Sequence, residues 1–164
     1  MRNSFYLALY ITAAILSATD GYKYLSDRDY SKAFKILAEN SPHQEVIVQE
    51  ILKRIRPGDS YLEIGPGDGK IARNIAPLFK KATYVEPNAL FAAELEGTVY
   101  HSTWEEVEID EEFDLAVCSH VLYHVPTCAW KEFIGKIAER SKMTVVVMEC
   151  AGSQLNKLLC RYNP

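Results

Sequence analysis

A chain of 164 residues fits a single domain, and a domain of this size can bury one core without disulfides or a structural metal. Its 48% of hydrophobic and 24% of charged residues argue against long disordered stretches. The formal net charge of −4 lacks the basic excess of a phosphate-tracking surface, which disfavours a nucleic-acid partner, and the cysteines and histidines match no common zinc spacing.

The chain opens with an apolar segment. Residues 5–18 (FYLALYITAAILSA) end in small side chains and follow Arg2, which is the pattern of a weak signal peptide. The segment is short for a membrane span. We expect residues 1–24 to form an apolar N-terminal segment, helical or signal-like, ahead of a domain at 25–164. The segment should be buried or cover a partner, with export or membrane tethering through residues 1–18 as the alternative.

Two amphipathic helices are predicted next. Residues 30–40 and 43–55 repeat apolar side chains at helical spacing. Between them, Ser41 can cap the second helix and Pro42 can occupy its first turn.

Strands and helices alternate from residue 60 onward. This order implies right-handed βαβ crossovers, so we expect an α/β fold with a Rossmann-like parallel sheet of about five strands and helices on both faces. The expected strands are 60–65, 82–87, 98–102, 113–120 and 143–150, and the expected helices are 68–81, 88–97, 127–140 and 152–162.

A glycine-rich turn follows the first of these strands. Gly65, Gly67 and Gly69 have the spacing GxGxG rather than the GxGxxG of dinucleotide sites, and Asp68 can cap the helix that follows. Ligands of parallel sheets bind beyond the carboxyl ends of the strands, where this turn lies. Glu86 ends the next strand, where an acidic side chain can accept both hydroxyls of a ribose. The turn and Glu86 together predict a nucleoside site and disfavour a pyrophosphate.

These segments resemble a known family. LEIGPGDG, YVEPN and FDLAVCSHVLYHV are similar to the motifs of class I S-adenosylmethionine-dependent methyltransferases, and the resemblance covers about residues 30–150. It implies that S-adenosylmethionine is the cofactor, which favours a cytoplasmic location. It also implies cofactor-binding residues: Glu63, Gly65 and Gly67 at the methionine and ribose, Glu86 at the ribose hydroxyls, Thr103 and Trp104 at adenine, and Ser119 near the sulfonium.

A narrower resemblance is to histamine N-methyltransferase and its relatives. It is carried by YSKAFKILAENSPHQ, by LYHV and by ECAGSQLNKLLCRY. Tyr123 and His124 match aromatic positions of that acceptor pocket. Pro42, however, stands before His43 and Gln44 where those enzymes have the acid that binds the amine. We therefore expect a small-molecule acceptor other than histamine.

Methyl transfer from a sulfonium depends mainly on positioning, and a base helps by removing a proton from the acceptor. The candidates for the catalytic site are His120, Tyr123 and His124, with a structural hydrogen-bonding role as the alternative for each histidine. Tyr22, Tyr24 and Tyr30 either fold over the cofactor or anchor the N-terminal segment.

Class I methyltransferases usually continue after the fifth strand with a hairpin that this sequence lacks. The apolar strand at 143–150 would then form an exposed edge, which either residues 5–18 or a second copy of the chain should cover. We expect a homo-oligomer. The alternatives to an active methyltransferase are an inactive relative that binds the cofactor as a regulatory or interaction protein and, less favoured by the GxGxG spacing, an NAD-binding domain.

Overall fold

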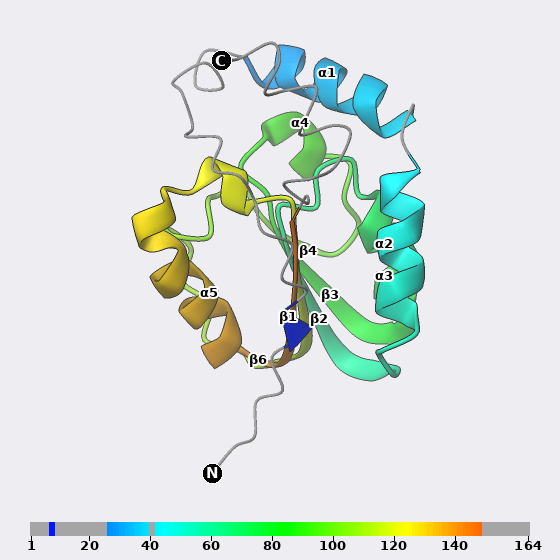
Figure 1. Cartoon of the computed structure of the whole chain (residues 1–164), viewed down its shortest axis with the longest axis vertical. Helices are drawn as coiled ribbons and strands as arrows, with labels where there is room; N and C mark the ends of the chain where they lie inside the picture. The colour runs from blue at the N-terminus through cyan, green and yellow to red at the C-terminus, as the bar shows by residue number, and fades with distance from the viewer. Residues whose placement is uncertain (1–6, 9–25, 40–41, 149–164) are drawn as a thin grey trace.

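The structure is a computed structural model that describes residues 7–8, 26–39 and 42–148. The described residues contain one parallel sheet with the strand order β1-β6-β5-β2-β3-β4 (Figure 1). The five expected strands are confirmed, and a two-residue strand joins them. Their bounds are β1 Leu7–Ala8, β2 Gly58–Ile64, β3 Phe79–Val85, β4 Thr98–Tyr100, β5 Phe113–Ser119 and β6 Ser141–Val147.

Helices cover both faces of this sheet, as expected for parallel βαβ units. In Figure 1, α2 and α3 lie on one face and α5 on the other, whereas α1 and α4 lie beyond the carboxyl ends of the strands. The helices are α1 Asp27–Glu39, α2 His43–Leu52, α3 Lys70–Ile75, α4 Ala89–Ala92 and α5 Trp130–Glu139, with 3-10 turns at Ala76–Leu78, Leu122–His124 and Thr127–Ala129.

The central strands are buried on both faces. Tyr61 and Leu62, neighbours on β2, point to opposite sides and are both fully buried. Tyr61 packs with the α2 and α3 side of the core, which includes Val48, Ile51, Ile71, Ile75 and Leu115. Leu62 packs with the α5 side, which includes Ile64, Val85, Trp104, Phe113, Phe133 and Ile137.

Some expected boundaries were wrong. The helix expected at 68–81 ends at Ile75, and β3 already begins at Phe79. Pro77 cannot donate to a helix, and the Phe79 ring stacks on Tyr61 with centroids 5.5 Å apart, which favours the strand.

Three other helices differ from their expected bounds. Helix α1 starts earlier than expected, at Asp27, and α2 ends earlier, at Leu52. Helix α4 occupies only Ala89–Ala92 of the expected 88–97. The helix expected at 152–162 lies outside the described residues.

Two of the seven residues of β6 pair with the N-terminal strand at the edge of the sheet. Leu7 pairs with Val145 and Ala8 pairs with Val146, both in parallel register. The expectation that the apolar N-terminal segment covers this edge is confirmed for these two residues, whereas the homo-oligomer stays a prediction. Within the described ranges, no helix has the length and apolar character needed to cross a bilayer.

Candidate functional site

The chain runs outward from β2 to β3 and β4, then returns to place β5 on the other side of β2. Strand order therefore reverses between β2 and β5, and a ligand site is expected beyond the carboxyl ends of these strands. The glycine turn, Gly65 to Gly69, leaves β2 at this point.

The turn requires glycine because its backbone is left-handed. Gly65, Gly67 and Gly69 have φ angles of 63°, 57° and 71°. Gly65 donates its N–H to the carbonyl of Val85 at 2.8 Å, which ties the turn to the end of β3. A Cβ at Gly65 would lie 2.5 Å from Cγ2 of Val121, so the site tolerates no side chain there.

Glu86, just after β3, is joined to the turn. Its Oε2 accepts the N–H of Gly67 at 3.0 Å, and its Oε1 accepts the N–H of Asn88 at 2.9 Å. The residue is 4% exposed, and this burial raises the pKa of its carboxyl, an effect that the two backbone donors partly offset. Since each carboxylate oxygen has a second lone pair, Glu86 can still accept two further hydrogen bonds.

Glu63 lies one residue before the end of β2 and is buried. The hydroxyl of Tyr61 donates to its Oε2 at 2.6 Å. Burial raises the pKa of Glu63 to about 8; the Tyr61 hydrogen bond opposes this shift, and the negative charges of Asp68 and Glu86 add to it. At neutral pH this carboxyl is therefore largely protonated, and a cation brought close to it would favour ionisation.

Ser119 ends β5, beside the glycine turn, because the preceding Cys118 pairs with Ile64. Its Oγ is buried and has no hydrogen-bond partner among the described residues. A buried hydroxyl without a partner costs free energy, which is a reason to expect a ligand here.

His120, the next residue, has a φ of 60°. This left-handed conformation is uncommon for a residue other than glycine and is found more often at functional sites. The N–H of His120 donates to the carbonyl of Val147 at 2.9 Å, which fixes the backbone at the ends of β5 and β6.

The three candidate catalytic residues, His120, Tyr123 and His124, lie within a segment of five residues. Nδ1 of His120 lies 3.3 Å from the hydroxyl of Tyr123, and the two rings stack. Nε2 of His124 lies 3.5 Å from the hydroxyl of Tyr30 on α1. The His124 side chain is exposed to solvent, its ring meets that of Tyr30 edge-on, and its partial desolvation lowers its pKa.

Aromatic residues of α1 cover this end of the sheet. Phe34 lies against the turn, since a Cβ at Gly67 would be 3.2 Å from its ring. The rings of Tyr30 and Phe34 both pack against the ring of Phe91 on α4 in T-shaped geometry. Their centroids lie 6.3 and 5.5 Å from that of Phe91. Of the three tyrosines expected to cover the cofactor or anchor the N-terminus, Tyr30 lies over the site, and the other two lie outside the described residues.

Polar contacts hold α1 against α4. Ser31 donates to Oδ1 of Asn88 at 3.2 Å, and Nδ2 of Asn88 donates to the carbonyl of Asp27 at 3.1 Å. Lys35 and Glu94 form an ion pair at 2.8 Å. Because Asn88 also caps α4 and donates to Glu86, α1 is anchored next to the expected ribose position.

Thr103 and Trp104, the residues expected at adenine, differ in their surroundings. Trp104 is 2% exposed, and its indole N–H donates to the carbonyl of Phe133 at 3.3 Å. The ammonium of Lys136 lies over the indole ring of Trp104, with Nζ 4.9 Å from the ring centroid. The Trp104 ring therefore belongs to the core beneath α5. The adenine contact expected of Thr103, which is half-buried, stays a prediction.

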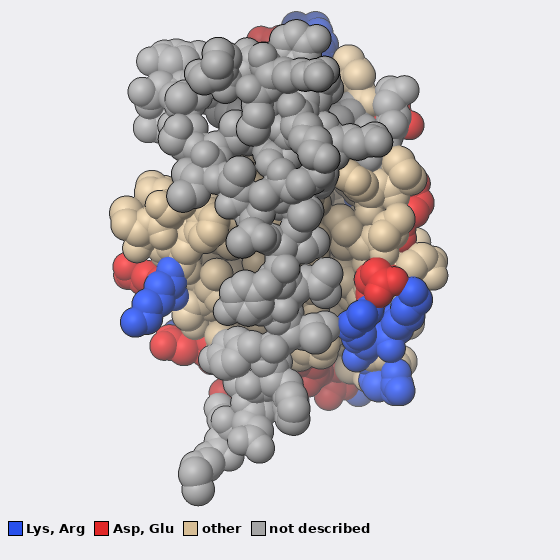
Figure 2. All heavy atoms as spheres, in the orientation of Figure 1, with Lys and Arg blue, Asp and Glu red and all other residues tan. Residues whose placement is uncertain are grey.

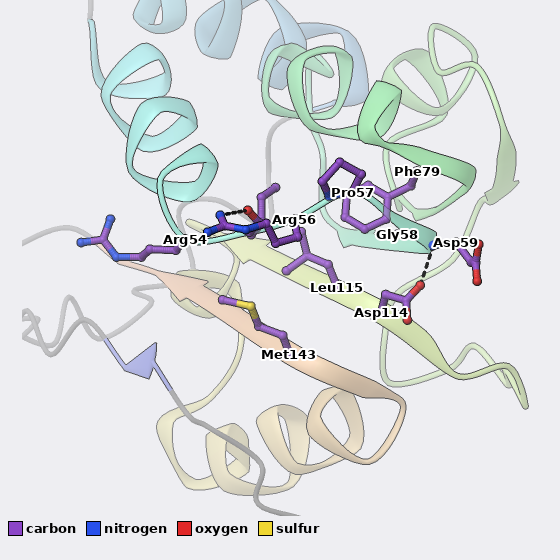
Figure 3. A pocket seen from close by; sticks show the side chains of 10 residues that line it. Arg54, Arg56, Pro57, Gly58, Asp59, Phe79, Asp114, Leu115 and Met143 are labelled. Carbon is purple, nitrogen blue, oxygen red and sulfur yellow. Dashed lines mark hydrogen bonds between the residues drawn. The ribbon is translucent and has the colours of Figure 1, made fainter.

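A depression of about 510 Å³ lies at the opposite end of the sheet, where the strands begin (Figure 3). Its lining includes Gly58 and Phe79, the first residues of β2 and β3, and Asp114 and Met143 near the starts of β5 and β6. It is therefore separate from the glycine turn and takes no part in the candidate site.

On the described part of the face in Figure 2, basic side chains lie beside acidic ones. Among the described residues, ion pairs join Lys53 and Arg54 to Glu50, Lys70 to Glu45, Lys81 to Glu111, and Lys142 to Asp114. Part of the positive charge is therefore paired with neighbouring carboxylates.

Solved structures share this fold at low sequence identity. DhpI in a SAM-HEP complex aligns with a TM-score of 0.60 at 17% identity, over 88% of this chain and 70% of DhpI. The N-methyltransferase NodS from Bradyrhizobium japonicum aligns with a TM-score of 0.56 at 17% identity, over 63% of this chain and 65% of NodS. An S-adenosylmethionine-dependent methyltransferase from Clostridium acetobutylicum aligns with a TM-score of 0.51 at 17% identity, over 60% of this chain and 44% of that protein.

The chain thus spans less than two thirds of the length of the last two proteins. No curated protein matches it at a significant level, and the comparisons do not show the narrower resemblance to histamine N-methyltransferase. The family described as "Methyltransferase domain" matches residues 25–158, which include all the candidate site residues. With a match over most of its length, the chain belongs to this methyltransferase-domain family.

Proposed function

We propose that the protein is an S-adenosylmethionine-dependent methyltransferase that acts on a nitrogen or oxygen atom of a small molecule. The observation that carries this proposal is the hydrogen bond from Gly67 to Glu86, which holds a carboxylate beside a left-handed glycine turn. Membership of the methyltransferase-domain family supports the reaction class, and the likeness to the N-methyltransferase NodS supports a nitrogen acceptor.

The residues around the turn suit the parts of this cofactor. Glu86 has two remaining lone pairs for the ribose hydroxyls, and Glu63 is assigned to the methionine side of the turn. Ser119, with its buried hydroxyl, is assigned to the sulfonium side, and Thr103 to adenine.

When bound, S-adenosylmethionine supplies an electrophilic methyl group, which the acceptor's lone pair attacks while the electrons of the broken carbon–sulfur bond stay on sulfur. The protein's part is to hold the acceptor in line and to receive a proton. We assign His120, Tyr123 and His124 to this part, because His120 follows Ser119 directly and the other two lie within five residues of Ser119. The lowered pKa of His124 favours the neutral imidazole, the form that can accept a proton.

Calorimetric titration with S-adenosylmethionine and S-adenosylhomocysteine tests the cofactor. Both ligands should bind the wild type, and Glu86→Ala should weaken both by at least roughly tenfold, because it removes a charged acceptor. Glu106→Ala, which changes an exposed glutamate, is the matched control. Binding of neither ligand to the wild type would refute the proposal.

Transfer of a labelled methyl group to panels of small amines and phenols tests catalysis. It also separates an active enzyme from a relative that only binds the cofactor. His120→Ala, Tyr123→Phe and His124→Ala should lower the transfer rate while cofactor affinity stays close to that of the wild type. A loss of cofactor affinity equal to the loss of rate would remove these residues from the acceptor side.

A further inference from the structure

A second buried polar atom without a partner lies beside the glycine turn. Gln44, in the first turn of α2, donates from Nε2 to Oδ1 of Asp68 at 3.0 Å. Its other amide atom, Oε1, is buried and has no hydrogen-bond partner among the described residues. Because Oε1 and Nε2 are bonded to the same carbon, this atom also lies next to the turn.

The identity of the orphan atom follows from its neighbour. An ionised carboxylate only accepts hydrogen bonds, so the group that faces Asp68 must be the NH₂ of Gln44. Asp68 thereby fixes the orientation of the amide and leaves the carbonyl oxygen as the buried, unpaired acceptor. A buried acceptor in this state calls for a donor.

Charged groups of both signs surround Gln44: the carboxylate of Asp68 faces its amide, and Nη1 of Arg73 donates to the backbone carbonyl of Asp68 at 2.8 Å. Oδ1 of Asp68 already accepts the N–H of Lys70 at 3.2 Å but still carries negative charge next to the amide. The ammonium of Lys70 is hydrogen-bonded to Glu45 and is therefore neutralised by another residue. A ligand ammonium at Oε1 of Gln44 would gain both a hydrogen bond and an attractive charge.

We propose that Gln44 is a cofactor-binding residue whose Oε1 accepts a hydrogen bond from the α-ammonium of the methionine moiety. Asp68 is its positioning residue. Ser119 and Gln44 then mark two sides of the same turn, since Ser119 lies beside Gly65 and Gln44 contacts Asp68. This assignment rests on the proposed function, and it adds α2 to the elements that hold the cofactor.

The test compares two ligands that differ in the methionine moiety. S-adenosylhomocysteine carries the α-ammonium, whereas 5′-methylthioadenosine keeps the nucleoside and lacks the amino-acid part. Gln44→Met keeps the length of the side chain and removes the acceptor. Calorimetry should show roughly tenfold weaker binding of S-adenosylhomocysteine to this variant and unchanged binding of 5′-methylthioadenosine.

Gln49→Met, an exposed glutamine on the same helix, is the matched control and should bind both ligands as the wild type does. The inference is overturned if Gln44→Met leaves S-adenosylhomocysteine binding unchanged, or if it weakens both ligands equally. Failure of the proposed function has a different signature, because neither ligand would then bind the wild type.

Discussion

The backbone N–H of Gly67 donates to Oε2 of Glu86 at 3.0 Å. This bond joins the turn after β2 to the end of β3, and the N–H of Asn88 holds the other carboxylate oxygen. Two backbone donors therefore fix the orientation of Glu86 before any ligand arrives. A ligand that needs this carboxylate gains from an acceptor that loses little further freedom on binding.

Gly65→Ala should destabilise the protein by more than about 2 kcal/mol, because it combines a left-handed φ with a Cβ 2.5 Å from Cγ2 of Val121. Adding Val121→Ala removes the clash but not the backbone strain, so a double-mutant cycle in urea should give a favourable coupling energy. Gly135→Ala is the control: a Cβ there meets no atom within 4 Å, and the change should stabilise α5 by about 0.5–1 kcal/mol. Absence of coupling between Gly65 and Val121 would contradict the packing described here.

Glu63→Gln should change how stability depends on pH. The pKa of Glu63 is about 8 in the folded protein against an ordinary 4.5, so the folded state binds this proton more tightly. The contribution of Glu63 to stability is therefore full below pH 4.5 and is lost as pH rises toward 8, by up to about 1.4 kcal/mol per pH unit. Urea unfolding between pH 5 and 8 should show a steeper fall for the wild type than for Glu63→Gln, which stays neutral. Parallel curves would refute the raised pKa.

The sheet could be predicted from sequence because buried parallel strands are short apolar runs between helical segments. Gly65, Gly67 and Glu86 were found because they lie at the ends of such strands. Phe79 was assigned to a helix because its strand depends on pairing with Gly58, a contact that local spacing does not contain.

The residues that sequence reasoning missed act across long separations. Phe34 was assigned to the apolar face of a helix, but nothing in its spacing indicates that it lies against Gly67. Asn88 joins α1 to α4 through Ser31, which is 57 residues away. Gln44 was noted only as part of a resemblance, and its orphan oxygen becomes visible only once Asp68 lies next to it.

Trp104→Phe should lower the unfolding free energy by about 2 kcal/mol, because the indole fills the core under α5 and donates to the carbonyl of Phe133. The affinity of the folded variant for S-adenosylhomocysteine should stay unchanged, since the ring has little exposed surface to offer adenine. Thermal unfolding and calorimetry on the same sample measure both quantities. Weaker binding of S-adenosylhomocysteine without a loss of stability would contradict this prediction and indicate that Trp104 contacts adenine.

Removal of residues 1–10 should increase self-association, because it takes away Leu7 and Ala8 and leaves the edge of β6 with unpaired backbone groups. Removal of residues 1–5 keeps the paired strand and serves as the control. Sedimentation velocity at several concentrations should show larger species for the first variant than for the second. The same experiment on the full chain tests the homo-oligomer expected from the sequence, and equal sedimentation of the two truncated forms would mean that β1 does not protect this edge.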